Sequence, residues 1–229
     1  MVIWGFVTQF FIGHSSWLAS AAGVLIGAVL LWDLLFRSQI GFSMCFLEEM
    51  WSRNLGHLFV SPLRPHEFII SMMVVSCLRG FFGLLPSWIL AFVFFEFSIL
   101  SYGLGIVAFF SCLMVMGWAL GMIVIALVLR FGLGAESLAW VAIFAFAPIS
   151  AVYYPVETLP AWLQIVAWCT PSAYVFEGMR SVLIDDIFRY DLLVGAILVN
   201  IVYLFAGIFI FSFSFLGARK QGKLLQTGE

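Results

Sequence analysis

Long apolar stretches, each of a length that crosses a lipid bilayer, constrain this chain more than any other feature of its sequence. Five are prominent: Trp17–Phe36, Phe68–Phe95, Tyr102–Leu129, Leu138–Tyr154 and Leu192–Leu216. About 20 helical residues, each rising about 1.5 Å, cross a hydrocarbon layer of about 30 Å. We therefore predict an all-α polytopic membrane protein.

The composition excludes a soluble domain. Hydrophobic residues make up 64% of the chain and charged residues 10%, whereas soluble domains carry about 25% charged residues. No Gly/Ser-rich linker or charge run divides the sequence, so residues 1–229 are expected to form one domain. The four cysteines show no CxxC spacing, which favours helix packing over a metal or disulfide site.

A sixth apolar stretch, Met1–Ile12, is too short to span the membrane, since twelve helical residues reach only about 18 Å. A signal peptide is disfavoured because no Lys or Arg precedes Arg37. We interpret it as a first span whose amino-terminal part is missing, which predicts a six-span bundle. The span Leu138–Tyr154 is short and contains Pro148, so we expect it to be bent.

Basic residues predict the orientation of the spans, because Lys and Arg are concentrated in cytoplasmic loops. If the amino end is cytoplasmic, only Arg180 and Arg189 lie on the outer side of the membrane, and Arg79 lies within a span. Both termini are then cytoplasmic. The basic residues expected on the cytoplasmic side are Arg37, Arg53, Arg64, Arg130, Arg219, Lys220 and Lys223.

A charged segment, residues 42–66, connects the second and third expected spans. Its apolar residues recur at helical spacing and predict an amphipathic helix, Glu48–Phe59, that Ser61 and Pro62 terminate. Such a helix either docks on a partner or lies on the lipid headgroups. The apolar residues of this helix are Met50, Trp51, Leu55, Leu58 and Phe59.

Two segments resemble one known family. "FLEEMWSRNLGHLFVSPLRPHEF", from Phe46, resembles the cytoplasmic loop of type-2 ABC transporter permeases. "YYPVETLPAWLQIVAWCTPSAYVFEGMRSVL", from Tyr153, is similar to the outer segment of that family. The order of six spans with both ends inside is also the family's order, and the resemblance covers all but an amino-terminal cytosolic helix.

The resemblance implies a role for each segment. The cytoplasmic helix would be a coupling helix that fits a groove of a cytosolic ATP-binding subunit. In the outer segment, residues 155–190, the stretches Leu159–Cys169 and Ser172–Leu183 would be short re-entrant helices. The implied coupling residues are Glu48, Glu49, Trp51, Arg53, Leu55, Leu58, Pro62 and Arg64. The implied residues of the outer segment are Pro155, Pro160, Trp162, Pro171, Glu177 and Arg180.

The energy source must lie in another subunit if ATP is used. The chain lacks the GxxxxGK[ST] pattern that cradles phosphates, and its three histidines lie at span ends or in the cytoplasmic loop, where they cannot assist a buried nucleophile. We expect no enzyme, cofactor or nucleic-acid partner in this chain. ATP and magnesium would bind the partner subunit of a homodimeric exporter in a bacterial inner membrane. The alternative is an ion-gradient-driven secondary transporter or a channel.

Arg79 lies near the middle of an expected span, where an arginine costs about 2.5–3.5 kcal/mol. One interpretation is a contact to an anionic substrate group or a gate. The other is an ion pair within the protein, with Asp33 or Glu96 as candidate partners, or snorkelling of the side chain toward the headgroups. On the outer side, Glu177 and Arg180 are three residues apart and are expected to pair on one helix face.

Overall fold

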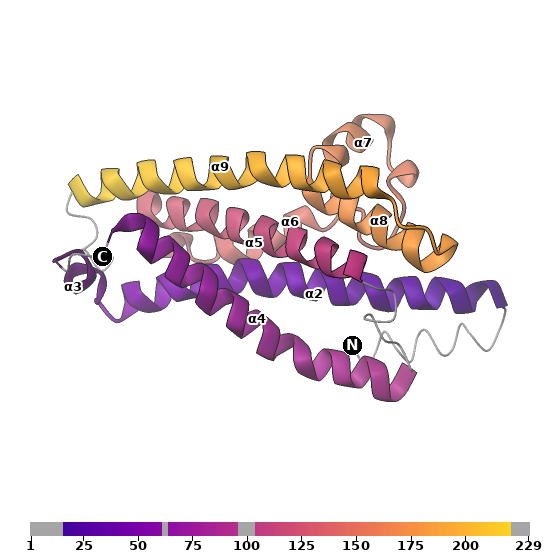
Figure 1. Ribbon diagram of the computed structural model, residues 1–229. Coiled ribbons are helices and arrows are strands. Elements are labelled where there is room, and N and C mark those ends of the chain that lie inside the picture. The colour runs from indigo at the N-terminus through magenta and orange to yellow at the C-terminus, as the bar shows by residue number, and fades with distance from the viewer. Residues whose placement is uncertain (1–15, 61–63, 96–103, 221–229) are drawn as a thin grey trace.

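Four long helices dominate the fold. The computed structural model describes residues 16–60, 64–95 and 104–220, and all regular elements in these ranges are helical. The long helices are α2 (Ser16–Trp51), α4 (Pro65–Phe95), α5 (Leu104–Phe131) and α9 (Tyr190–Lys220). Figure 1 shows α2, α5 and α9 side by side, while α4 crosses α2 at an angle and diverges from the bundle.

Shorter helices lie at the two ends of the bundle. The six-residue α3 (Leu55–Val60) follows α2 at one end. At the other end, α7 (Ala161–Trp168) and α8 (Pro171–Asp185) precede α9 (Figure 1). The remaining elements are α6 (Leu138–Phe146) and the 3₁₀ turns η2 (Leu133–Ala135) and η3 (Val156–Thr158).

The four long helices are each long and apolar enough to cross a membrane. The prediction of an all-α polytopic membrane protein is therefore confirmed. The predicted number of six spans is not shown, because only four described helices qualify. The expected first span, Met1–Ile12, lies outside the described residues.

Helix α2 is longer than the span expected over Trp17–Phe36. It continues without a break for 36 residues, about 54 Å, to Trp51. The placement of Arg37 in a cytoplasmic loop was therefore wrong, because Arg37 lies inside the helix. Its Nε donates to Asp33 one turn earlier, at 2.9 Å, and this (i, i+4) pair is compatible with an unbroken helix.

The expected fourth span over Leu138–Tyr154 is also different. Helix α6 has nine residues and ends at Phe146, and turns carrying Pro148 follow. Nine residues rise about 14 Å, roughly half the hydrocarbon thickness. Proline removes a backbone donor and clashes with the preceding turn, so the expected bend is instead the end of the helix.

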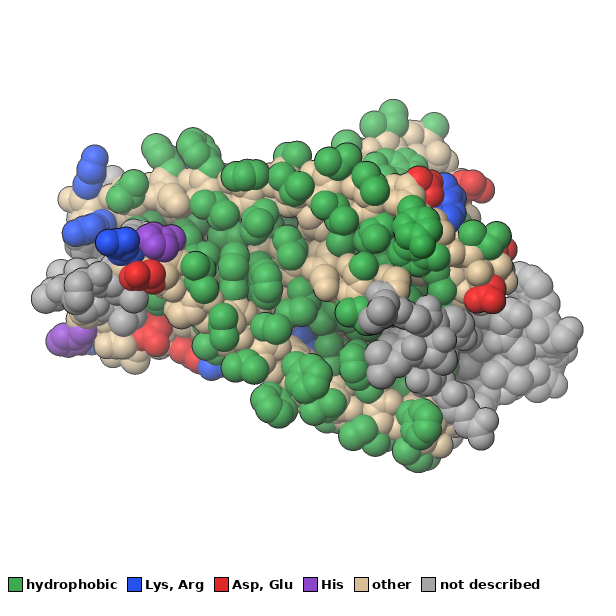
Figure 2. All heavy atoms as spheres, in the orientation of Figure 1, with side chains coloured by type: hydrophobic (Ala, Val, Ile, Leu, Met, Phe, Trp, Pro, Cys, Tyr) green, Lys and Arg blue, Asp and Glu red, His purple; other side chains and the backbone are tan. Residues whose placement is uncertain are grey.

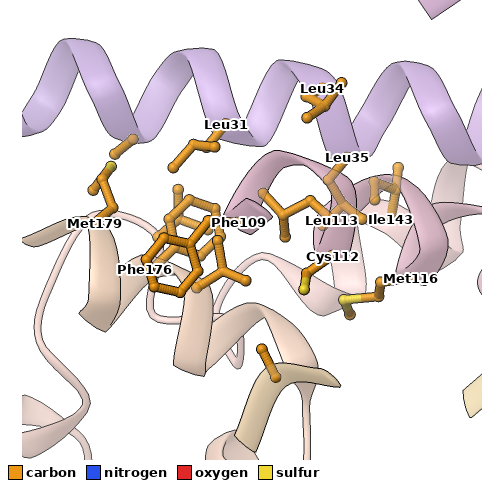
Figure 3. Close-up of a cluster of buried hydrophobic side chains, with 14 of the residues drawn as sticks. Leu31, Leu34, Leu35, Phe109, Cys112, Leu113, Met116, Ile143, Phe176 and Met179 are labelled. Atoms are coloured by element: carbon orange, nitrogen blue, oxygen red, sulfur yellow. The ribbon is translucent and has the colours of Figure 1, made fainter. Parts of the chain in front are cut away.

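The centre of the bundle is a continuous apolar core. Figure 3 shows Leu31, Leu34 and Leu35 of α2 facing α5 and α8. The side chains that they meet are fully or almost fully buried, and together they hold four helices in one packed unit. These side chains are Phe109, Cys112, Leu113 and Met116 of α5, Ile143 of α6, and Phe176 and Met179 of α8.

Two glycines let α2 and α5 approach closely. A Cβ on Gly117 would lie 2.6 Å from the Cβ of Ser38, and one on Gly121 would lie 2.9 Å from Cδ1 of Phe42. The Ser38 hydroxyl uses this proximity to donate to the carbonyl of Met114 at 2.9 Å. The small-xxx-small spacing on α5 therefore marks a true helix interface.

We predict that Gly117→Ala lowers thermal stability. The new Cβ would also lie 3.0 Å from the backbone nitrogen of Gln39, which cannot rotate away, and overpacking typically costs about 1–3 kcal/mol. The midpoint of thermal unfolding, followed by size-exclusion chromatography in detergent, should fall by several degrees. Gly217→Ala is the control, because nothing lies within 4 Å of its Cβ. Equal midpoints for both variants would contradict the close packing.

Candidate functional site

The candidate coupling segment consists of two helical pieces rather than one. The single helix expected over Glu48–Phe59 was wrong, because α2 ends at Trp51 and α3 begins at Leu55. Arg53, between them, has a left-handed backbone with φ of 57°, as residues after helix ends often do. Asn54 fixes the turn, since its Nδ2 donates to Oε2 of Glu49 at 2.6 Å.

The expected coupling residues on either side of the turn differ in how exposed they are. Trp51 is 43% exposed, and Glu48, Arg53 and His57 are exposed beside it. Leu55 is 1% exposed and packs in the same apolar cluster as Phe46 and Phe68. Leu55 therefore anchors the segment to the bundle and does not face outward.

The remaining expected coupling residues lie further along the chain. Arg64 is exposed, and its backbone N–H donates to Oε2 of Glu67 at 2.8 Å, which caps the start of α4. Leu58 belongs to α3. Pro62 lies outside the described residues. The expected loop, residues 42–66, thus includes the last ten residues of α2 and the first two of α4.

Glu48 and Arg79 join α2 to α4. Arg79 donates from Nη1 to Oε1 of Glu48 at 2.9 Å and from Nη2 to Oε2 at 2.6 Å. The expectation of an ion pair within the protein is confirmed, with Glu48 as the partner. Of the two expected partners, Asp33 pairs with Arg37 instead, and Glu96 lies outside the described residues. Sequence spacing could not identify Glu48, because 31 residues separate it from Arg79.

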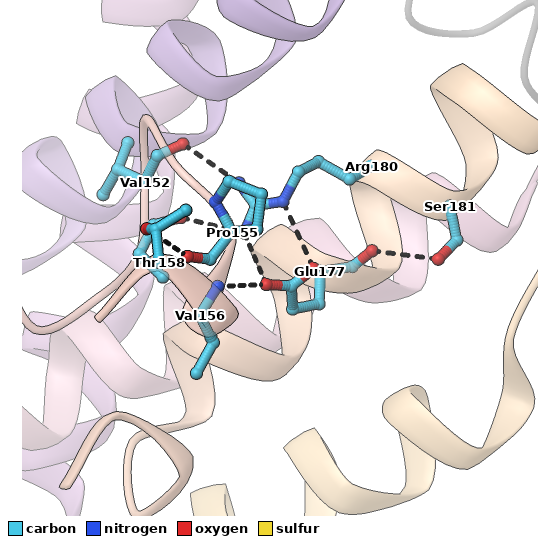
Figure 4. A network of polar contacts seen from close by, with 8 residues as sticks. Val152, Pro155, Val156, Thr158, Glu177, Arg180 and Ser181 are labelled. Carbon is cyan, nitrogen blue, oxygen red and sulfur yellow. Dashed lines mark hydrogen bonds and ion pairs between the residues drawn. The ribbon is translucent and has the colours of Figure 1, made fainter. Parts of the chain in front are cut away.

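A second polar cluster fixes the loop between α6 and α7. Arg180 is 7% exposed; its Nη2 donates to the Ala151 carbonyl at 3.0 Å and contacts Oε1 of Glu177 at 3.1 Å. The same Glu177 oxygen accepts the backbone N–H of Val156 at 2.6 Å (Figure 4). The predicted Glu177–Arg180 pair is confirmed, and it holds both ends of a loop that begins at Ala151, whose φ is 51°.

The prolines of this outer segment bound its helices. Pro155 precedes η3 with an extended backbone, Pro160 caps α7, and Pro171 opens α8 at its first position. Trp162 lies on α7 and is 69% exposed. The two short helices are therefore confirmed close to their expected bounds, whereas their depth in a membrane stays a prediction.

A cavity of about 300 Å³ lies between the outer loop and α2. Its walls are mainly apolar, with Arg180 and the Tyr153 phenol as polar groups. Burial raises the pKa of Tyr153, so this side chain is uncharged at neutral pH. In the described part of the chain no group of three His, Cys, Asp or Glu residues is arranged to hold a metal. The cavity walls are Val24, Leu25, Ala28, Val152, Tyr153, Pro155, Arg180 and Ile184.

The surface separates charge from apolar area. Figure 2 shows red, blue and purple side chains gathered at the two ends of the molecule, with a broad green band between them. A membrane protein shows this distribution because charges are costly in hydrocarbon. The α2–α3 turn and the outer clamp of Glu177 and Arg180 thus lie toward opposite ends of the apolar band (Figure 1).

Comparison with known protein families decides the class of this chain. The profile of the ABC-2 type transporter family matches residues 1–184. The chain belongs to the ABC-2 type transporter family. No curated protein sequence matches it significantly. As an ABC-2 membrane domain, it is a non-catalytic transmembrane subunit, and the family implies an ATP-binding partner subunit.

The end of this ABC-2 domain that carries the α2–α3 turn and the end that carries the Glu177–Arg180 pair differ in how well the sequence predicted them. The Glu177–Arg180 pair follows from (i, i+3) spacing on one helix. The Glu48–Arg79 pair and the burial of Leu55 depend on how helices distant in sequence pack together. Only the apolar character of Leu55 hinted at its burial.

We predict that the Glu48–Arg79 pair shows strong coupling in a double-mutant cycle. Glu48→Gln or Arg79→Gln alone leaves one charge without its bidentate partner, whereas the double variant leaves neither charge. The double variant should therefore unfold at a higher temperature than either single variant in nanodiscs. The Arg189–Asp191 pair is the control cycle. Its side chains are 50% and 62% exposed, against 45% and 46% for Arg79 and Glu48, but it joins no two helices and should show little coupling. Additive effects of the two single substitutions on the unfolding temperature would contradict the pairing of Glu48 with Arg79.

We predict that Glu177→Gln accelerates hydrogen exchange in the outer loop of the permease. The amide group has no charge, so it weakens the contacts to Arg180 and to the Val156 N–H. Mass spectrometry of a peptide covering residues 151–158 should show exchange about tenfold faster, a loss comparable to one charge-assisted hydrogen bond. Ser181→Ala is the control, because the Ser181 hydroxyl bonds only the Glu177 carbonyl among described groups. Unchanged exchange in Glu177→Gln would refute the clamp.

Proposed function

We propose that this ABC-2 domain is the membrane subunit of an ATP-driven exporter. ATP and magnesium bind a separate cytosolic subunit, and two copies of the permease form the transport pathway. The assembly lies in a bacterial inner membrane with both termini cytoplasmic. Support comes from the family match and from basic residues at the end of the bundle that carries α3, namely Arg53, Arg64, Arg130, Arg219 and Lys220.

The observation that carries this proposal is the link between the exposed α2–α3 turn and the bundle. Trp51 and Arg53 are exposed on the turn, while Leu55 is buried one residue after it ends. Glu48, one turn before the end of α2, is bonded to α4. A partner that displaces the turn therefore also displaces α2 and α4, and this gives ATP binding a mechanical route to the spans.

Transport would proceed by a shift between two packed arrangements of the spans. The outer clamp of Glu177 and Arg180 fixes the segment over residues 155–190 in the arrangement described, and its opening would release the substrate outward. Arg79 acts as a gate rather than a substrate contact in this scheme, because both its terminal nitrogens already contact Glu48.

The ion-gradient alternative has less support. A secondary transporter would place paired ionisable groups at the midplane together with internal repeats. The long helices α5 and α9 carry charged residues only near their ends, and the family match favours an ATP-driven mechanism.

We predict that Trp51→Ala weakens binding of the ATP-binding subunit. Exposed tryptophans at interface centres contribute about 2 kcal/mol or more when truncated, so affinity should fall about thirtyfold. The measurement is copurification with a candidate ATP-binding subunit, followed by quantitative determination of its affinity for the permease. Trp162→Ala, which removes an exposed tryptophan on the opposite end of the bundle, should retain full binding.

Two outcomes would contradict the proposal. Either Trp51→Ala binds the subunit as tightly as the original chain, or no nucleotide-hydrolysing subunit binds the permease at all. A chain that translocates substrate along an ion gradient without ATP would point to the secondary-transporter alternative.

A further inference from the structure

Arg37 is a cation at mid-membrane depth with unused hydrogen-bond donors. Its side chain is 38% exposed, and its Nε donates to Asp33 at 2.9 Å. Among the described residues, no acceptor lies within hydrogen-bonding distance of its Nη1 and Nη2 atoms. A guanidinium has five N–H donors, so four of them remain available.

The depth of Arg37 follows from the neighbouring helix. Ser38, the next residue, donates to the carbonyl of Met114 and packs against Gly117, which lies halfway along α5. Charged residues mark the two ends of α9, which packs beside α5. The guanidinium therefore lies within the hydrocarbon layer and far from either headgroup region.

The other arginines of the described ion pairs differ from Arg37. Arg79 uses both terminal nitrogens on Glu48, and Arg180 uses its nitrogens on Glu177 and on two carbonyls. Arg189 lies at the end of α9, exposed beside Asp191. Among the arginines of the described ion pairs, Arg37 is thus the one whose donors the protein leaves largely unfilled.

Hydrocarbon cannot satisfy these donors. Donors that face hydrocarbon without an acceptor are costly, so a partner for them must come from water, from an anion or from another chain. Within the sequence, residues 1–15, 104–129, 138–154 and 192–218 contain no Asp or Glu. The first segment, α5, α9 and the stretch that carries α6 therefore offer no carboxylate to Arg37.

Helix α4 leaves room for the guanidinium at one position. A Cβ on Gly83 would lie 2.6 Å from Nη1 of Arg37 and 3.3 Å from its Cζ. Gly83 thus leaves a recess in the surface of α4, because a side chain at this position would meet the guanidinium of Arg37. Helix α4 also exposes large apolar side chains along its length, including Leu78, Phe81, Phe82 and Ile89.

We infer that Arg37, held by Asp33 and recessed at Gly83, binds the anionic group of an amphipathic substrate. The phosphate or carboxylate would accept the free Nη donors as a bidentate partner, and the alkyl chain would lie along the apolar face of α4. This inference rests on the proposed transport function and specifies its substrate class.

The test measures equilibrium binding of radiolabelled dodecyl phosphate to the full chain in phosphatidylcholine nanodiscs, with empty nanodiscs subtracted. Unlabelled dodecanoate should compete, whereas dodecyltrimethylammonium, with the same chain and a cationic head, should not. Arg37→Gln should weaken binding about tenfold or more, because charge-assisted hydrogen bonds are lost. The affinity of Arg37→Lys should lie between those of the original chain and of Arg37→Gln, since lysine keeps the charge but loses the planar fork.

The glycines of α4 supply a matched pair of variants that leaves every charge in place. Gly83→Ala should displace the flexible tip of Arg37 and weaken binding several-fold, whereas Gly80→Ala has nothing within 4 Å of its Cβ and should bind normally. Unfolding temperatures of both variants verify that the fold is intact. Equal affinities of Gly83→Ala and Gly80→Ala for dodecyl phosphate would contradict a role of the recess in binding.

Three further results would overturn the inference. Binding that Arg37→Gln leaves unchanged, or that shows no preference for anionic over cationic amphiphiles, excludes the site. Dissociation of a dimer by Arg37→Gln, with no loss of dodecyl phosphate binding, would assign Arg37 to an acid of a second copy. If dodecyl phosphate binds but does not change the rate of ATP hydrolysis by the complex, Arg37 binds a resident lipid and not a transported substrate.

Binding to the permease alone separates this inference from the proposed function. If the ATP-binding subunit copurifies but Arg37→Gln binds normally, only the substrate site fails. If no ATP-binding subunit associates while Arg37 still binds the anion, the proposed function fails and the anion site stands.

Discussion

The hydrocarbon interior of a membrane offers no hydrogen-bond partners, and every polar group of this fold is placed under that constraint. Helices satisfy the backbone within each segment, which explains why every regular element of the described residues is helical. Side chains follow the same rule across helices: Ser38 bonds the Met114 carbonyl, Ser76 bonds the Ser38 carbonyl, and Asn200 bonds the Cys112 carbonyl. These contacts tie α2, α4, α5 and α9 into one unit.

The same constraint explains why the ionic groups of the spans are concentrated on two helices. Asp33, Arg37 and Glu48 lie on α2, and Arg79 lies on α4. Charges in a membrane are retained where they pair or meet water. The α2–α4 pair connects directly to the exposed turn at Trp51, so the element that would receive work from an ATP-binding subunit is also the element that carries the charges.

The sequence predicted the helices well and their ends poorly. Apolar stretches locate α4, α5 and α9 because membrane insertion depends on local composition. The predicted end of α2 was fifteen residues too early. A charged residue such as Arg37 after an apolar stretch indicates a loop unless its ion pair with Asp33 is taken into account. Local spacing predicted the Glu177–Arg180 pair, whereas Glu48–Arg79 depends on the crossing of two helices. The exposed Trp51 and buried Leu55 share an apolar character, so the sequence could not distinguish them.

The contrast between Arg79 and Arg37 bears on how such a protein moves a charged molecule. A bidentate pair such as Glu48–Arg79 is saturated, so its opening requires another conformation and suits a gate. A monodentate pair such as Asp33–Arg37 keeps donors free in the conformation already formed, and it can accept an anion without breaking. Both pairs lie along α2, so a displacement at the α2–α3 turn reaches the saturated pair first and the free cation second. A substrate held at Arg37 would therefore experience the motion only after the contact to α4 had been released.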